Sequence, residues 1–307
     1  MNRVMVKTRN PKKSLQLADR PGNVIILRMR IRLGYCPAPD GGFIIYGLAA
    51  GKVGSGDLEI ELISAKLPAL NDCATRGELE ATMISVAAYP YLRQRYILAR
   101  CGVSFVASGR GPVLAAREPL SEQDLETASV AVPDSTSSAI LALQIHRPGI
   151  RTRLIPADKV AQAAKMGLAD CALLPSGDTA MCRQSGLYCV ADLAAGWAKQ
   201  SGQMPLPMTC FAIRSDLPDE VRLGIETALR DSIRYSLAHR VEASAFAAQC
   251  ARGTACWEAD PAALGTYVSE HSLDVDDPQR LAVEEFLRRG HDAQIVPNAL
   301  PIRFVGS

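Results

Sequence analysis

The side chains best suited to metal or thiol chemistry are scattered through this sequence. There are nine cysteines, an odd number, and no two of them form a CxxC pair. The four histidines show no HxxxH spacing or similar ligand pattern. We therefore expect no structural zinc site, and the thiols should be reduced and mostly buried. No ligand cluster or phosphate-binding loop appears, so the sequence implies neither a metal nor an organic cofactor.

Hydroxyl groups and glycines near the ends of predicted strands are better candidates for binding a ligand. Ser137 and Ser138 follow a predicted strand and open a predicted helix, where hydroxyls and backbone N–H groups can hold an anion. Simple N-capping explains the same pair, since serine is a preferred cap residue. Ser85 is either a ligand contact or a polar strand end. Gly109 and Gly111 could present backbone N–H groups to a ligand or act only as a hinge.

Composition and charge narrow the class of partner. The 307 residues, 48% of them hydrophobic, suffice for one large domain or two medium ones. A formal net charge of +2 gives no reason to expect nucleic acid or an anionic membrane, so a small molecule is the expected partner. The oligomeric state stays open.

The basic N-terminus lacks the apolar run of a signal peptide or of a membrane span. Residues 1–28 are therefore predicted to be a flexible basic extension, or Met29 is the true start. Either reading places the protein in the cytoplasm.

Strand and helix patterns alternate from Met29 onward, which predicts an α/β protein with mainly parallel sheets. A compact βαβαβ unit is expected over 129–174. A helix is predicted over Tyr89–Ala99, and Gly290 is expected to end the last helix. One long amphipathic helix follows from a four-residue apolar repeat, formed by Val221, Ile225, Leu229, Ile233 and Leu237.

Two crossings of the chain between these units predict a two-lobed fold of the periplasmic-binding-protein type. Residues 29–114 and 208–307 would form lobe 1, and residues 115–207 would form lobe 2. The cleft between the lobes is then the expected ligand site.

A series of segments resembles the 1,4-dihydroxy-6-naphthoate synthase family of the futalosine route to menaquinone. Each motif is weak alone, but they follow one another in order from about Met29 to Gly290. The segments are CPAPDGGFIIYGLAAGK (36–52), SVAAYPYL (85–92), GRGPVL (109–114), VAVPDSTSSA (130–139), SGQMPLPMTCFAIRSD (201–216), YSLAHR (235–240), YVSEHSLD (267–274) and VEEFLR (283–288).

The resemblance implies a cytoplasmic lyase that acts on cyclic dehypoxanthine futalosine or a related molecule, with a carboxylated aromatic bicycle bound in the cleft. Ser137 and Ser138 match a threonine pair of the family, and Ser85 matches a family serine near the ligand. These positions are expected to contact the substrate.

Two departures from the family pattern affect the expected chemistry. The family loop resembles S-P-C-P-N-D-T-F, whereas this chain has Cys36-Pro-Ala-Pro-Asp-Gly-Gly-Phe43, so only the carboxylate of Asp40 remains to hold ligand hydroxyls. The family's H-E-G becomes Pro175-Ser176-Gly177, and proline cannot act as a general base.

Replacement bases are therefore sought nearby. Asp178 could face the cleft or be a solvated turn carboxylate, and Asp40 could be a base or part of an Asx-turn. Cys36 replaces a serine at a strand end and is either a reactive thiolate or a packed, inert thiol.

Three functions stay open on these grounds. The chain could be a lyase of the naphthoate synthase type, a sensor that closes on a small carboxylate without chemistry, or a transport-type solute-binding protein with a misassigned N-terminus.

Overall fold

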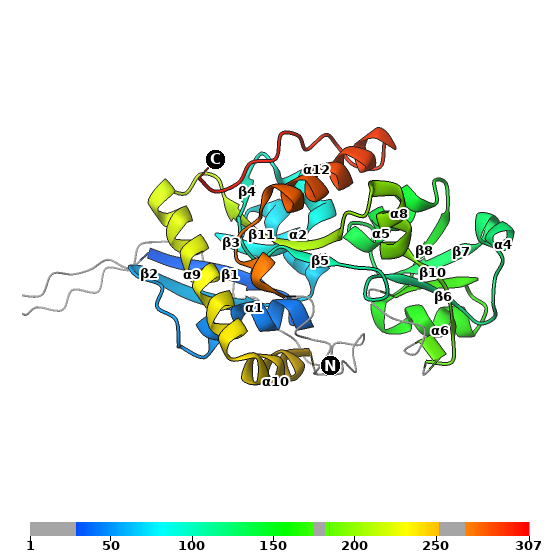
Figure 1. Ribbon diagram of the computed structural model, residues 1–307, viewed down its shortest axis with the longest axis horizontal. Coiled ribbons are helices and arrows are strands. Elements are labelled where there is room, and N and C mark those ends of the chain that lie inside the picture. Colours follow the sequence, from blue (N-terminus) through cyan, green and yellow to red (C-terminus); the bar gives the residue numbers. More distant parts are fainter. Residues whose placement is uncertain (1–28, 175–181, 184, 252–267, 307) are drawn as a thin grey trace, which may run out of the picture.

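The computed structural model describes residues 29–174, 182–183, 185–251 and 268–306. It is a mixed α/β structure whose two sheets lie side by side along the longest axis of the molecule (Figure 1). The predicted two-lobed α/β fold is confirmed. Among the described residues, no helix is long and apolar enough to cross a membrane.

The first sheet has six strands in the order β2-β1-β3-β11-β4, with β5 also paired to β11. The parallel core of this sheet is β1 (Met29–Tyr35) between β2 (Leu58–Ser64) and β3 (Ala81–Ser85). Strand β11 (Leu206–Arg214) runs antiparallel to β3, β4 (Tyr96–Leu98) and β5 (Ser104–Val106). The sheet is therefore mixed, which corrects the expectation of mainly parallel pairing.

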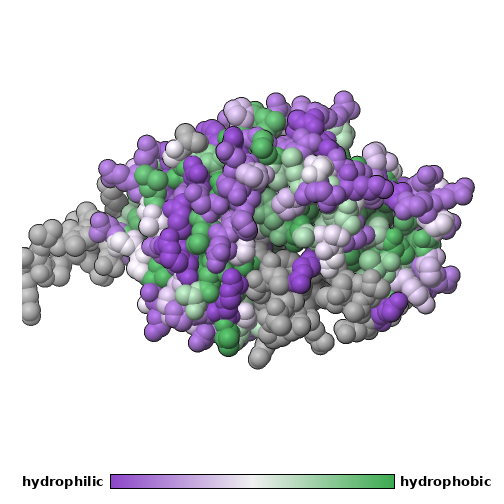
Figure 2. All heavy atoms as spheres, in the orientation of Figure 1, coloured by the Kyte–Doolittle hydropathy of each residue, from purple (hydrophilic) through white to green (hydrophobic). Residues whose placement is uncertain are grey.

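Helices from both ends of the described chain pack on this sheet. Helix α1 (Pro39–Ala49) contacts α9 (Asp219–Ala238) and α10 (Arg240–Ala251), and α2 (Leu67–Arg76) lies on β3. The predicted apolar stripe of α9 is confirmed, because its central residues Ile225, Leu229 and Ile233 are fully buried. Figure 2 shows hydrophilic residues over the outer faces of α9 and α12 (Asp277–Asp292).

The second sheet has five strands in the order β10-β6-β9-β7-β8. Its parallel core is β9 (Cys171–Leu174), β7 (Ser129–Val132) and β8 (Arg151–Leu154). Antiparallel β6 (Val113–Ala116) and β10 (Tyr188–Asp192) complete it. The helices of this unit are α4 (Glu122–Thr127), α5 (Ser138–His146), α6 (Val160–Lys165) and α8 (Leu193–Ser201), with a 3-10 turn, η2, at Ala157–Lys159.

The chain passes between the sheets after β5 and again before β11. The predicted division between residues 114 and 115 falls inside β6, all of which pairs within the second sheet. The start of β11 at Leu206 lies two residues before the other predicted division. We therefore propose that the lobes divide within the segment between β5 and β6 and within the segment between α8 and β11.

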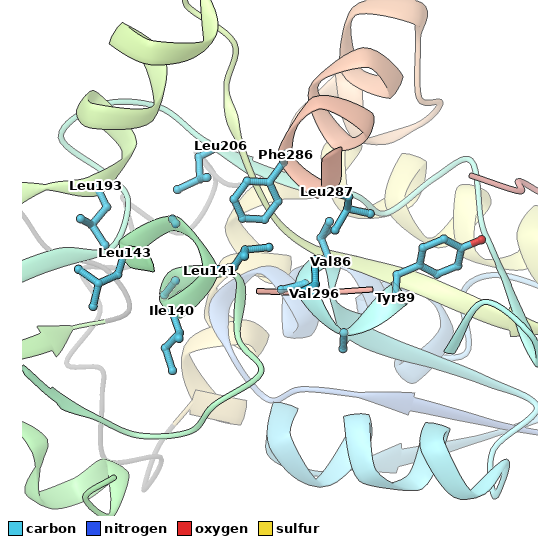
Figure 3. Close-up of a cluster of buried hydrophobic side chains, with 14 of the residues drawn as sticks. Val86, Tyr89, Ile140, Leu141, Leu143, Leu193, Leu206, Phe286, Leu287 and Val296 are labelled. Carbon is cyan, nitrogen blue, oxygen red and sulfur yellow. The ribbon is translucent and has the colours of Figure 1, made fainter. Parts of the chain in front are cut away.

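A single hydrophobic cluster extends across the junction between the two sheets. Figure 3 shows Leu141 of α5 among Val86, Phe286 and Val296, which belong to segments far away in sequence. Burial of such side chains stabilises by about 1.5–3 kcal/mol each, so the two units pack as one body along this seam. The seam includes η1 (Val86–Ala88) and α3 (Tyr89–Leu92).

Two local predictions were wrong. Residues 89–99 do not form one helix: α3 ends at Leu92, and Tyr96–Leu98 instead pairs with β11, where Tyr96 donates its hydroxyl to the Leu79 carbonyl at 2.7 Å. Gly290 does not end α12, which continues to Asp292. A Cβ at Gly290 would lie 2.9 Å from Leu141 Cδ1, so this glycine permits the close approach of α5.

The contact between α1 and α10 predicts a specific sensitivity at Gly42. A Cβ built on Gly42 would lie 2.9 Å from Ala247 Cα, closer than folded proteins allow, and the obstacle is backbone. We expect Gly42→Thr, which installs the residue of the family loop, to destabilise the protein by about 1–3 kcal/mol through overpacking. Urea denaturation measures the change.

The matched control is Gly54→Thr, because a Cβ at Gly54 meets no atom within 4 Å. Equal losses of stability in both variants would contradict the packing argument.

Candidate functional site

A cavity of about 460 Å³ lies between the two sheets and takes its walls from both units. The first unit supplies the loop before α1, the start of α2, and the strand ends of β3, β5 and β11. The second unit supplies the loop before α5, the turn η2, and parts of α6 and β9. The lining residues include Cys36–Asp40, Lys66–Pro68, Ser85, Ser104, Val106, Pro133, Asp134, Ser137–Ala139, Ala157, Asp158, Leu173, Leu174, Ser185, Met208 and Thr209.

A second cavity of about 440 Å³ lies at the start of α9 and carries two arginines. Both are already engaged: Arg222 binds the Ser215 carbonyl at 2.6 Å and also Asp219, and Arg303 donates to backbone carbonyl groups. The cavity between the sheets is therefore the better candidate site.

Helices α1, α2 and α5 all begin at this cavity. The N-cap residues of α1 and α2, Ala38 and Lys66, make no side-chain cap, and each helix has a proline in its first turn. In α1, the carboxylate of Asp40 already accepts the N–H of Gly41. The N-terminus of a helix carries partial positive charge and unpaired N–H groups, which favour a bound anion. Lys66, just before α2, is exposed and adds a full positive charge to the cavity lining.

Ser85 and Ser138 form a buried hydrogen-bonded joint between the units. Ser138 N–H donates to Ser85 Oγ at 2.7 Å, and the two hydroxyl oxygens lie 3.0 Å apart. Ser138 Oγ also donates to the Met208 carbonyl at 2.7 Å. Since each hydroxyl has one proton, the Ser85 proton must point to Ser138 Oγ, and neither serine keeps a proton for a ligand.

Ser137 differs from Ser138 in this respect. Its hydroxyl oxygen accepts a hydrogen bond from Ile140 N–H, so it is the N-cap of α5, and its own proton has no acceptor among the described residues. Ser137 is half-buried and lines the cavity. Of the serines predicted to bind a ligand, it is the one whose hydroxyl can still donate.

Asp40 lies on the opposite side of the cavity, in the first turn of α1. Its Oδ2 accepts hydrogen bonds from Thr209 Oγ1 at 2.9 Å and Ser104 Oγ at 3.1 Å, while Oδ1 accepts the N–H of Gly41. Thr209 is in register with Ser104 on β5 and with Ser85 on β3, so these hydroxyls form one row across the sheet.

The other predicted residues are placed differently. Cys36 lines the cavity and is half-buried. Gly109 and Gly111 do not line it: Gly109 N–H donates to Asp192 at 2.6 Å, and Gly111 packs against Ala194. Asp192 thus holds this loop, and the ligand role of Gly109 and Gly111 stays a prediction. Asp178 and Pro175–Gly177 lie outside the described residues.

Lys66, Ser104 and Thr209 were missed at the sequence level. Lys66 could have been found, because it stands between the end of a strand, β2, and the start of a helix, α2, the usual position of ligand groups in α/β sheets. Ser104 and Thr209 carry no local signal, since they meet Asp40 from 64 and 169 residues away.

The remaining walls are largely apolar, with prolines, Val106, Leu174 and Met208. Such walls suit a flat aromatic body whose polar groups reach the serines, the helix starts and Lys66. Within the described ranges, no three histidine, cysteine, aspartate or glutamate side chains are placed to hold a metal ion.

The fold and the cavity define a two-lobed α/β protein of the periplasmic-binding-protein type. The ligand-binding component of an import system from Staphylococcus aureus superposes with a TM-score of 0.64 at 13% identity, covering 88% of this chain and 94% of its own. The sulphonate-binding protein SsuA from Escherichia coli gives 0.60 at 12%, covering 89% and 96%. At these identities the likeness concerns the fold alone.

Closer relatives identify the family. Residues 31–292 match the family model described as menaquinone biosynthesis. The 1,4-dihydroxy-6-naphthoate synthase of Thermus thermophilus is 33% identical over 256 residues, which are 82% of this chain and 91% of the relative. That of Streptomyces coelicolor is 27% identical over 277 residues, 87% and 95% of the two chains.

A crystal structure of an Archaeoglobus fulgidus protein has a TM-score of 0.78 and 28% identity, covering 87% of this chain and 98% of its own. The chain therefore belongs to the 1,4-dihydroxy-6-naphthoate synthase family of menaquinone biosynthesis, and the resemblance of its motifs is confirmed.

The different bonding of Ser137 and Ser138 predicts different effects of alanine substitution on stability. Ser138→Ala leaves the Met208 carbonyl and the Ser85 hydroxyl without their partner, and we expect a loss of about 1–3 kcal/mol. Ser137→Ala removes only a cap and should cost about 1 kcal/mol. Urea denaturation of both variants, at one protein concentration, checks the order. A larger loss of stability for Ser137→Ala than for Ser138→Ala would contradict the hydrogen-bonded joint between Ser85 and Ser138.

Proposed function

We propose that this chain is a cytoplasmic lyase of the 1,4-dihydroxy-6-naphthoate synthase type. Its substrate is cyclic dehypoxanthine futalosine or a related carboxylated aromatic. One observation carries the proposal: the cavity between the sheets combines apolar walls with converging helix N-termini, a serine hydroxyl and a lysine. This combination is complementary to a flat apolar body that carries a carboxylate.

The carboxylate is held by the start of α5 and by Lys66. Ser137 donates its hydroxyl, and the positive ends of α2 and α5 favour the negative charge. Ser85 and Ser138 act indirectly, because their protons are used between the two units. They set the position of α5 and so the place of Ser137.

Asp40 supplies the base in this proposal. It lines the cavity as a carboxylate, and its contacts come from hydroxyls and one N–H group rather than from a cation. Asp134 has a structural role instead, because its carboxylate accepts the N–H groups of Thr136 and Ser137 in a local turn. Asp178 stays a second candidate, since the sequence places it three residues after Pro175, where the resemblance puts the histidine of the family.

Turnover of cyclic dehypoxanthine futalosine, followed as naphthoate absorbance, tests the reaction and the base together. We expect Asp40→Asn to lower kcat by about 10²–10⁴, the usual contribution of a general base. Asp158→Asn is the matched control, because Asp158 is an exposed carboxylate on the same cavity. An active Asp40→Asn variant together with an inactive Asp178→Asn variant would transfer the role to Asp178.

Binding and turnover, measured on the same protein sample, distinguish the remaining candidate functions. Binding of the substrate without turnover by the wild-type protein would mean a sensor, and neither binding nor turnover would mean a different ligand. Each result would reject the proposed reaction.

Lys66 gives a prediction about affinity that does not depend on the chemistry. Lys66→Met keeps the aliphatic length and removes the charge, and we expect the Kd for the aromatic carboxylate to rise about tenfold. The effect should shrink as the salt concentration rises. Calorimetric titration measures it, with Lys52→Met as the control, since Lys52 is exposed and does not line the cavity. Equal Kd values for both variants would remove Lys66 from the site.

A further inference from the structure

Asp40 belongs to a closed triangle of oxygen atoms at the cavity wall. Asp40 Oδ2 lies 2.9 Å from Thr209 Oγ1 and 3.1 Å from Ser104 Oγ, and the two hydroxyl oxygens lie 2.6 Å from each other. Every side of the triangle is thus a hydrogen-bond distance. The hydroxyls are buried, with 2% of Ser104 and 8% of Thr209 exposed, whereas Asp40 reaches the cavity.

The triangle is built by three separate segments. Asp40 comes from the first turn of α1, Ser104 from β5 and Thr209 from β11. Ser104 and Thr209 face each other across the strand pair, directly after an irregularity in the register between Pro207 and Thr209. Such a bulge re-aims side chains, and here it accompanies the meeting of both hydroxyls at one carboxylate oxygen.

The number of protons in the triangle depends on the charge of Asp40. With Asp40 ionised, the two hydroxyls supply two protons for three sides, so one side holds no hydrogen bond. With a proton on Oδ2, there are three protons for three sides. Each oxygen then donates once and accepts once, and the ring is complete. The geometry therefore accommodates one additional proton without moving a heavy atom.

We propose that Asp40, Ser104 and Thr209 form the proton-accepting centre of the cavity. The inference rests on the proposed function for its substrate, but not for the ring itself. In the reaction, a bond between the substrate and a proton breaks, and its electron pair stays on the substrate, where it can expel the leaving fragment. The proton bonds to Asp40 Oδ2 and becomes the third proton of the ring. It returns to solvent after the product leaves.

Asp40 touches the substrate in this scheme and is the catalytic residue. Ser104 and Thr209 are positioning residues, because they act through Asp40. Among the described residues, the other titratable groups that line the same cavity are Cys36 on the same loop, Lys66 before α2, Asp134 before α5 and Asp158 on η2. Cys250 of α10 lies beside Gly42 of α1. Burial raises the pKa of the Cys250 thiol, so it stays neutral near pH 7.

Infrared difference spectroscopy of the unliganded protein tests the ring without any turnover. Subtracting the spectrum of Asp40→Asn isolates the carboxylic acid band of Asp40. We expect this band to move to higher wavenumber in the Ser104→Ala/Thr209→Val double variant, because the acid proton loses its acceptor. An unchanged band would overturn the proposal. Should the double variant not fold, Thr209→Val alone opens the ring but leaves Ser104 as an acceptor, and we then expect a smaller shift in the same direction.

Kinetics then link the ring to the reaction. We expect Thr209→Val to lower kcat about tenfold with little change in KM and to displace the pH profile of kcat, and we expect Thr209→Ser to restore both. Ser236→Ala and Thr82→Val are controls for loss of a buried hydroxyl, since both residues lie outside the cavity lining.

The proposed reaction and the proposed hydrogen-bonded ring can be rejected independently of each other. A band shift without wild-type turnover would reject the substrate and keep the ring. Turnover with an unchanged band and an unchanged pH profile would keep the reaction and reject the ring.

Discussion

The hydrogen bonds that join Ser85, Ser138 and the Met208 carbonyl are the constraint on which the cavity depends. They connect the end of β3, the start of α5 and strand β11 in a buried place, where an unpaired polar group would cost about 1–3 kcal/mol. The adjacent residue of β11, Thr209, holds Asp40. One short stretch of β11 therefore sets both the distance between the units and the orientation of the carboxylate.

The fold could be predicted where a periodic pattern is long. The stripe of α9 was found because its apolar residues recur at a regular spacing over a helix of 20 residues. Strands β4 and β5 have three residues each, too few to show an alternation, and they exist because β11 pairs with them. Helix α10 was missed because its alanine-rich sequence has little contrast between its faces.

The candidate site could be predicted only where a ligand group sits at a strand end or a helix start. Ser137 met that criterion and lines the cavity. Ser138 met it too, yet its proton is used inside the protein, which no sequence pattern reveals. Gly109 was expected to offer its N–H group, but Asp192 takes it from 83 residues away. Partners so distant in the chain are set by tertiary packing rather than by local sequence.

The contact between Gly42 and Ala247 also limits which side chains the first loop can carry. The resemblance places a threonine where this chain has Gly42, and α10 now occupies the space that a side chain would need. A side chain at position 42 would therefore strain the fold before it could contact a ligand. Accommodating it would require a shift of α10 or a second substitution on that helix. The conformation of the first loop is thus coupled to the position of α10, although the two segments lie about 200 residues apart.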